Sequence, residues 1–309
     1  MRILVLGAGG IGGYFGGRLV EKGEDVVFLV REKRKKQLEE NGLKIKSVNG
    51  DYSFTPKLIT KEDRAEPFDI VLLSPKAYHL KGAIHDLRPF VGEKTVIIPL
   101  LNGISHLEIL KESFNESQIL GGLCIIETTL NASGEVVQTS PFDQLVFGEL
   151  NHEKTDRIKK IGDTFAGTKA DFRLSEQILQ DMWHKYLRIT VLSSITTLTR
   201  APIGPIRESA GSKEFISRLY QEVTQIMRAY NAPIADNIEE EQLESISNLK
   251  FNFKTSMQRD MEKGSMIEGE HIQGYLMELA NELNIETPYL DVIYQNLKVY
   301  IKMLSTPSE

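Results

Sequence analysis

The feature that most constrains the fold is a glycine-rich segment directly after the first apolar run. Residues 2–6 read RILVL, and Gly7, Gly9 and Gly12 follow with the spacing G-x-G-x-x-G. Between a strand and a helix, these glycines permit a tight turn, close approach of a phosphate and close helix–strand packing. The helix N-terminus adds unpaired N–H groups and a positive dipole end. The plainer interpretation is a glycine turn without a ligand. The predicted dinucleotide-binding residues of this segment are Gly7, Ala8, Gly9, Gly10, Ile11 and Gly12.

Short β-branched runs alternate with helical or polar stretches through the first half of the chain. This rhythm predicts a parallel, doubly wound sheet. The expected buried strands are Arg2–Leu6, Val26–Val30, Ile70–Leu73 and Val96–Ile98, with a helix at Gly16–Lys22 that ends at Gly23. Three later runs, Ile119–Ile126, Val136–Thr139 and Leu145–Phe147, are separated by N-A-S-G and S-P-F-D, so we expect turns there and hairpin strands closing one side of the domain.

From about Ser175 onward the pattern is helical, with almost no strand signal. Ser175 reads as the start of a capped helix, and Thr287-Pro288 opens a last helix that we expect to reach about Met303. The fold class that follows is α/β: an N-terminal Rossmann-like doubly wound domain, residues 1–174, followed by an all-α C-terminal domain, residues 175–309.

Composition excludes several classes of protein. The chain has 37 basic and 43 acidic residues, a formal net charge of −6, which disfavours binding to nucleic acid. No apolar stretch reaches the roughly 20 residues of a membrane span. The single cysteine, Cys124, lies inside an apolar run and is expected in the core. The histidine spacing matches no metal-ligand pattern. We therefore expect a cytoplasmic protein with no metal and no nucleic-acid or membrane partner.

The end of the second strand bears on the choice of cofactor. An acidic residue there usually holds the ribose 2′-hydroxyl of NAD, whereas this chain has Arg31. A guanidinium suits a 2′-phosphate, which favours NADP(H). Glu32 is the counter-argument, because its carboxylate could serve the hydroxyl instead. Lys33 to Lys36, a stretch that includes Arg34, are expected to form a solvated helix face.

Lys185 interrupts an apolar helical stripe that contains Ile178, Met182, Ile189 and Leu192. Two interpretations are open. The stem packs while the ammonium reaches water, or the amine lies in a cleft, partly desolvated, and serves as a general acid. The neighbouring His184 faces elsewhere and is expected to pack or to lie at the surface.

Three further polar residues stand where ligands often bind. Lys76 and Asn102 each follow a predicted strand, at the carboxyl edge of the sheet, although either one could simply be a turn residue. Glu268 lies at the start of a helix, where the dipole alone would favour a carboxylate.

Together these motifs resemble the ketopantoate reductase (2-dehydropantoate 2-reductase) family along the whole chain. The matching features are G-x-G-G-I-G, Pro75-Lys76, Asn102-Gly103, the W-x-K of Trp183–Lys185, and the S-M-x-x-D that starts at Ser256, twelve residues before Glu268. The resemblance implies NADPH-dependent reduction of 2-dehydropantoate to (R)-pantoate, a step of pantothenate biosynthesis, in a cleft between two domains.

The resemblance also implies roles for individual residues. Lys185 would be the general acid, and Glu268 would orient the substrate and the lysine. Asn102 and Ser256 would contact the substrate or the nicotinamide end, Lys76 would lie near the cofactor ribose and the substrate, and Arg31 would hold the dinucleotide together with residues 7–12.

The chain departs from the family at two substrate positions. The family helix reads K-x-x-x-N-x-x-x-N, whereas Ile189 and Ser193 stand at the two asparagine positions here. The pocket is therefore expected to be more apolar than pantoate chemistry requires. The alternatives are an NAD(P)-dependent enzyme for another 2-keto or 2-hydroxy acid with a more apolar side chain, and a non-catalytic dinucleotide-sensing protein. The expected partner is a small 2-keto acid, and a homodimer is an open alternative for the oligomeric state.

Overall fold

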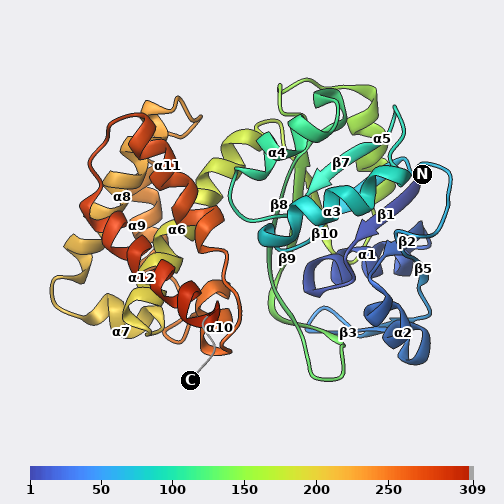
Figure 1. Cartoon of the computed structure of the whole chain (residues 1–309), viewed down its shortest axis with the longest axis horizontal. Helices are drawn as coiled ribbons and strands as arrows, with labels where there is room; N and C mark the ends of the chain where they lie inside the picture. The colour runs from blue at the N-terminus through green and yellow to red at the C-terminus, as the bar shows by residue number, and fades with distance from the viewer. Residues whose placement is uncertain (306–309) are drawn as a thin grey trace. The chain divides into compact units, whose positions relative to one another are not determined.

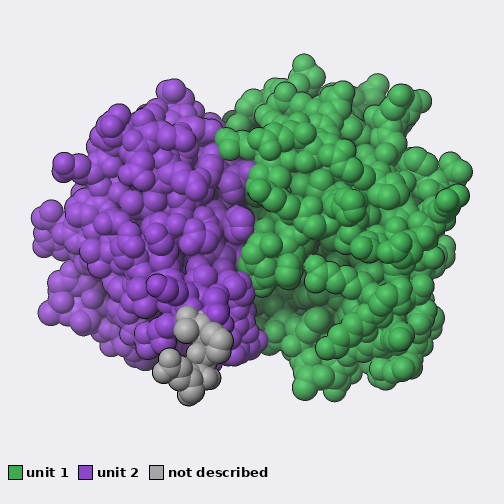
Figure 2. All heavy atoms as spheres, viewed as in Figure 1, with its two compact units in different colours: residues 1–101, 106–179 green, residues 102–105, 180–309 purple. Residues whose placement is uncertain are grey.

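The computed structural model describes residues 1–305 and divides into two compact units, coloured separately in Figure 2. Unit 1 comprises residues 1–101 and 106–179. Unit 2 comprises residues 102–105 and the described residues from 180 onward. The expected domain boundary near residue 174 stays a prediction, and residues 306–309 of the predicted second domain lie outside the described residues.

The first sheet of unit 1 is parallel throughout, as predicted, with the strand order β5-β2-β1-β6-β7 (Figure 1). Every residue of β1 (Arg2–Leu6) except the first is buried, as is every residue of β6 (Ile70–Leu73). Strands β2 (Asp25–Leu29) and β6 flank β1 on opposite sides, so the strand order reverses at β1. Doubly wound sheets bind ligands beyond the carboxyl ends of the strands at such a point.

A second sheet in unit 1 has the order β10-β9-β3-β4, with β8 also paired to β9. The N-A-S-G turn connects β8 (Gly121–Leu130) to β9 (Val136–Gly148), as expected. The prediction of a turn at S-P-F-D was wrong, because β9 continues through these residues as one strand. The pairing with β8 shifts register between Ile126 and Thr128, and a proline is tolerated where a ladder is interrupted in this way.

Helix α1 (Gly10–Lys22) packs between the two sheets, and its glycines make this possible. A Cβ on Gly16 would lie 2.7 Å from the Phe28 ring of the first sheet. A Cβ on Gly17 would lie 2.5 Å from Cδ1 of Ile45 in the second sheet. The helix begins at Gly10, six residues earlier than the expected Gly16. Glycine is a poor helix former, so the glycines concealed this start in the sequence, whereas close packing requires them here.

Unit 2 is helical within the described residues, as expected for the C-terminal part of the fold class. Its buried centre includes α6 (Ile178–Thr199), where Val191, Leu192 and Ile195 are almost fully buried. The last helix, α12, spans Pro288–Ser305 and packs against α8 (Ser212–Ala229). Among the described helices, none combines the length and apolar composition needed to cross a membrane.

The remaining elements have the following bounds in chain order: α2 Glu32–Asn41, β3 Leu43–Ser47, β4 Tyr52–Phe54, β5 Lys57–Ile59, η1 Ala77–His79, α3 Leu80–Leu87, η2 Arg88–Phe90, β7 Val96–Pro99, α4 His106–Ser113, η3 Glu116–Gln118, α5 Asp156–Phe165, β10 Asp171–Leu174, α7 Ile203–Glu208, α9 Ile238–Ser247, α10 Ser256–Glu262, η4 (a π-helical turn) Glu270–Gly274 and α11 Tyr275–Glu282.

Candidate active site

The loop between β1 and α1 has the geometry that its glycines predict. Gly7 has a φ of +95°, a conformation that favours glycine, and its N–H donates to the carbonyl of Leu29 at 3.1 Å. A Cβ on Gly12 would lie 2.0 Å from the backbone oxygen of Gly7, so helix and loop approach too closely for any side chain. A Cβ on Gly9, by contrast, would meet no atom within 4 Å. The loop therefore leaves open space beside Gly9.

The same loop presents the start of α1 to that space. Gly9 is the N-cap residue and provides no side-chain cap, and the first turn of α1 contains no acidic residue. The first N–H groups of a helix lack intrahelical acceptors and carry the positive end of its dipole. These features fit the phosphates of a dinucleotide.

Arg31 follows the carboxyl end of β2 and Lys76 follows that of β6, the two strands that flank β1. Arg31 is the exposed residue immediately before α2, and Lys76 is the half-buried residue immediately before η1. The pKa of His79, the last residue of η1, is lowered by burial and then by the charge of Arg31. Arg31 is therefore close enough to the β6–α3 segment for its charge to act there.

Arg34 is a residue that the sequence interpretation placed wrongly. It is half-buried instead of solvated, and its Nε and Nη2 atoms donate to the carbonyl oxygen of Ala8 at 3.1 and 2.9 Å. Its position three residues after Arg31, on the first turn of α2, was the available signal. Spacing along a helix could not show that the glycine loop, 26 residues earlier, comes within reach.

The candidate catalytic residues lie in unit 2. Lys185 is half-buried on α6, and its Nζ atom donates to Oδ1 of Asn102 at 3.1 Å. Asn102 follows β7 in sequence, yet the segment Asn102–Ser105 belongs to unit 2. Along the predicted stripe, Met182 and Leu192 are buried on either side of the lysine. The structure thus joins the amine of a half-buried lysine to an amide oxygen from a loop.

The Asn-Gly pair makes a turn that also serves packing. Gly103 has a φ of +83°, and a Cβ there would lie 3.1 Å from the carbonyl oxygen of His271. The ring of Tyr186 lies 3.9 Å from the same Cβ position. The loop that carries Asn102 therefore lies directly against α6 and the turn η4.

Glu268 precedes η4 and is 6% exposed. Its backbone oxygen accepts hydrogen bonds from the N–H groups of His271 and Ile272 at 3.1 and 3.0 Å. The hydroxyl of Tyr186 donates to the carbonyl of Ile272 at 2.6 Å, which ties this turn to α6. Single π-helical turns occur frequently at functional sites.

The other predicted substrate residues have different surroundings. Ile189 is half-buried on α6. Ser193 is 3% exposed, and its hydroxyl oxygen accepts a hydrogen bond of 2.8 Å from Nε2 of Gln273. Ser256 is exposed at the first position of α10. The roles assigned to these three residues stay predictions.

Two residues that the sequence analysis set aside pack as expected. His184 is half-buried, and its Nε2 accepts the N–H of Ala235 at 3.0 Å. Burial lowers the pKa of this imidazole despite the nearby carboxylates of Glu241 and Asp181. Cys124 is 5% exposed and belongs to the core of unit 1. Within residues 1–305, no group of three or more His, Cys, Asp and Glu side chains is placed to hold a metal.

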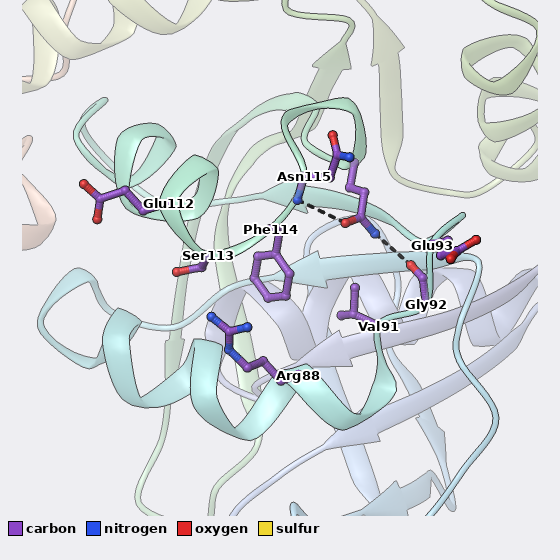
Figure 3. Close-up of a pocket in the computed structure, with 9 residues that line it drawn as sticks. Arg88, Val91, Gly92, Glu93, Glu112, Ser113, Phe114 and Asn115 are labelled. Carbon is purple, nitrogen blue, oxygen red and sulfur yellow. Dashed lines mark hydrogen bonds between the residues drawn. The ribbon is translucent and has the colours of Figure 1, made fainter.

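A pocket of about 420 Å³ lies elsewhere in unit 1 (Figure 3). It is formed by the segment between α3 and β7, by the end of α4 and by the segment that follows α4, with Arg88 over the ring of Phe114 at 5.7 Å. Its residues 88–93 directly precede β7, and its residues 112–118 precede Ile119, which forms a parallel bridge to Ile97 of β7. The pocket therefore belongs to the edge of the sheet opposite the carboxyl ends. None of the candidate residues lines it.

Comparison with known proteins places the chain in a family. The model described as ketopantoate reductase PanE/ApbA matches residues 3–152, and its C-terminal counterpart matches residues 177–301. The chain belongs to the ketopantoate reductase family. This confirms the resemblance, and the protein is an oxidoreductase of that family.

The relatives of this ketopantoate reductase family member differ in what their names say. An uncharacterized oxidoreductase of Bacillus subtilis, YkpB, is 43% identical over 300 residues, 97% of this chain and 99% of that protein. The structure of 2-dehydropantoate 2-reductase from Geobacter metallireducens matches with a TM-score of 0.87 and 27% identity, covering 97% and 99% of the two chains. D-mandelate dehydrogenase with NADH and anilino(oxo)acetate has a TM-score of 0.89 at 18% identity, covering 99% and 100%, and so shares the fold.

Proposed function

We propose that this protein reduces a 2-keto acid to the 2-hydroxy acid with NADPH, and that the first candidate substrate is 2-dehydropantoate, which would give (R)-pantoate. The observation that carries the proposal is the contact between Lys185 Nζ and Asn102 Oδ1 at 3.1 Å. Asn102 holds the amine of Lys185 through one hydrogen bond, and an amine fixed in this way can donate a proton to a reacting carbonyl oxygen. With 2-dehydropantoate as substrate, the reaction would belong to pantothenate biosynthesis.

Reduction of a ketone makes its oxygen negative as the carbon accepts a hydride. Bound NADPH supplies that hydride. Lys185 stabilises the developing charge with its ammonium and transfers a proton from Nζ to the oxygen. Asn102 orients the amine through its Oδ1 atom. Glu268 is buried just before η4, and its carboxylate orients the substrate and the lysine.

The cofactor assignment rests on unit 1. The open space at Gly9 and the first turn of α1 suit a pyrophosphate. Arg31 is an exposed cation at the end of β2, where the adenine ribose of a dinucleotide lies in this kind of sheet, and it suits a 2′-phosphate. We therefore propose NADPH over NADH, with Lys76 near the ribose and the substrate.

A second candidate substrate is a 2-keto acid with an apolar side chain. Ile189 cannot form a hydrogen bond, and the Ser193 hydroxyl is buried and already bonded to Gln273. These positions, where the family has asparagines, therefore offer little to a substrate hydroxyl. An unpaired polar substrate group at such a place costs about 1–3 kcal/mol, so an apolar group is preferred there.

NADPH oxidation assayed with a panel of 2-keto acids tests the proposal. Turnover of 2-dehydropantoate far above that of the other acids supports the first candidate, and preference for an aromatic or aliphatic keto acid supports the second. Dinucleotide binding without turnover of any keto acid would contradict the reductase assignment and favour a sensing protein. A homodimer and a cytoplasmic location stay predictions.

A further inference from the structure

Arg34 makes an unusual contact with the glycine loop. Its Nε and Nη2 atoms donate to the same acceptor, the carbonyl oxygen of Ala8. The third nitrogen, Nη1, donates to Oε1 of Gln37 at 2.6 Å. All three nitrogens of the guanidinium are therefore used, and two of them hold the peptide between Ala8 and Gly9.

Among the residues that the structure describes, none balances the charge of Arg34. Within residues 1–305, no carboxylate lies within ion-pair distance of its guanidinium, and both of its acceptors are neutral. Burial alone lowers the pKa of Arg34. Arg157 is a contrasting case in the same unit, because its hydrogen bonds to Glu149 raise its pKa. A half-buried cation with neutral partners is costly unless an anion compensates for it.

The side chain is also held in place from its far side. Nε2 of Gln37 donates to the carbonyl oxygen of Ser133, in the turn between β8 and β9. Gly134 in that turn has a φ of +78°, and a Cβ there would lie 2.7 Å from Nη1 of Arg34. The hairpin of the second sheet therefore packs against the guanidinium and restricts its position.

Peptide geometry connects this contact to the open space beside Gly9. The C=O and N–H groups of a trans peptide point in opposite directions. Holding the Ala8 oxygen toward Arg34 therefore directs the Gly9 N–H away from α2. A Cβ on Gly9 would meet no atom within 4 Å, so this side of the loop has room for a ligand.

We propose that Arg34 is a positioning residue of the dinucleotide site: it orients the Ala8–Gly9 peptide for the pyrophosphate, and the bound phosphates balance its charge. This inference rests on the proposed function and adds a second cation to Arg31 with a different task. The pyrophosphate is common to NADPH and NADH, so Arg34 acts on both cofactors, whereas Arg31 distinguishes between them.

The test compares dissociation constants of NADPH and NADH, from nucleotide fluorescence, for the parent protein, Arg34→Gln and Arg34→Lys. The matched control is Lys36→Gln, which removes one charge from an exposed residue of the same helix. Losing a charge-assisted hydrogen bond predicts that Arg34→Gln weakens both dinucleotides about tenfold to a hundredfold. Arg34→Lys keeps the charge and recovers part of the affinity, and Lys36→Gln matches the parent.

A second measurement separates positioning from a purely structural role. With the keto acid found to be turned over, Arg34→Gln raises the KM for NADPH while kcat at saturating NADPH stays close to that of the parent. Saturating NADPH also raises the melting temperature of Arg34→Gln less than that of the parent.

Three results would overturn the inference. Unchanged dissociation constants in Arg34→Gln, or an equal loss in Lys36→Gln, would exclude the proposed role while leaving the reductase intact. A change confined to NADPH would show that Arg34 reads the 2′-phosphate and does not position the pyrophosphate. A parent protein that binds neither dinucleotide would refute the proposed function itself, and this inference with it.

Discussion

The hydroxyl of Tyr186 donates a hydrogen bond of 2.6 Å to the backbone oxygen of Ile272. Tyr186 directly follows Lys185 on α6, and the N–H of Ile272 donates to the backbone oxygen of Glu268. One buried hydrogen bond therefore connects the helix of the proposed proton donor to the turn that follows the proposed orienting carboxylate. Burial raises the pKa of Tyr186 well above its ordinary value, so the hydroxyl of Tyr186 keeps its proton, and this hydrogen bond persists, over the working range of pH.

Replacing Tyr186 with phenylalanine should lower both stability and turnover. The carbonyl of Ile272 would lose its partner, at a cost of about 1–3 kcal/mol in the free energy of unfolding. The turn would also hold Glu268 less firmly, so kcat should fall more than NADPH affinity. Urea denaturation and steady-state kinetics measure the two effects. Tyr220→Phe is the matched control, because the buried hydroxyl of Tyr220 has no hydrogen-bond partner among the described residues and its loss should change little.

Replacing Lys185 with alanine should reduce kcat by about 10²–10⁴, the usual contribution of a general acid. The dissociation constant of NADPH should change little, because the residues proposed to hold the pyrophosphate and the adenine ribose belong to unit 1 whereas Lys185 belongs to unit 2. Asn102→Ala should have an intermediate effect, since the amine remains but loses the Oδ1 atom to which it donates. Equal turnover in Lys185→Ala and the parent would remove this lysine from the mechanism.

Replacing Arg31 with alanine should raise the KM for NADPH and leave the KM for NADH almost unchanged. The reason is that the 2′-phosphate of NADPH loses the cation that binds it, whereas the 2′-hydroxyl of NADH does not depend on that cation. The ratio of kcat/KM for the two cofactors measures the change, with Lys36→Ala as a control for the general charge of α2. An unaltered ratio would assign the 2′-position to another residue.

Two glycine substitutions should separate packing from ligand binding. Gly12→Ala should destabilise unit 1, because its Cβ would lie 2.0 Å from the backbone oxygen of Gly7, and overpacking costs about 1–3 kcal/mol or more. Gly9→Ala should keep the melting temperature of the parent, since its Cβ would meet no atom of residues 1–305 within 4 Å, yet it should weaken NADPH binding. Thermal melts with and without NADPH distinguish the two. If Gly9→Ala binds NADPH normally, the open space beside the loop does not receive the phosphates.

The pair formed by Glu149 and Arg157 should make unit 1 sensitive to acid. Glu149 is 5% exposed and accepts hydrogen bonds from Arg157 at 2.7 and 2.5 Å and one from Thr155. Burial alone would raise the pKa of Glu149, but these hydrogen bonds outweigh it and hold the pKa below its ordinary value. A lowered pKa stabilises the fold above the unfolded-state value of about 4.3, and this stability is lost as the pH falls through the folded-state pKa.

Glu149→Gln tests that linkage. The variant should be less stable at neutral pH by about 1.5–3 kcal/mol, the size of hydrogen bonds to charged groups. Its stability should also depend less on pH between neutrality and acid than that of the parent. Melting temperatures across this range measure both effects, and parallel acid profiles for the two proteins would contradict the assignment.

The strands that the sequence predicts well are those buried on both faces. The runs Ile70–Leu73 and Arg2–Leu6 form β6 and β1 with the expected ends. The short strands β4 and β5 were missed, because three half-exposed residues carry too little pattern. The S-P-F-D segment looked like a turn because its composition is typical of one, whereas it forms an irregular part of β9, where the pairing with β8 shifts register.

The candidate site shows the same division. The glycine spacing predicted the loop, because each of these glycines is needed for a local backbone conformation or for close packing. The contact of Arg34 with Ala8 and the bond from Tyr186 to Ile272 could not be predicted, because each joins residues far apart in sequence. The hydrogen bond from Nε2 of Gln273 to the hydroxyl of Ser193, a predicted substrate residue, could not be predicted either, because it joins residues 80 positions apart.

The four-residue segment Asn102–Ser105 makes the helical unit discontinuous along the chain. No single cut can therefore release that unit intact. A fragment starting at residue 180 would lack Asn102, whose amide oxygen accepts the hydrogen bond from Lys185. A fragment ending at residue 179 would still contain residues 102–105, which belong to the helical unit. Recombining halves of related enzymes at one crossover would transplant this loop with the wrong partner, so exchanges of substrate preference should include both segments.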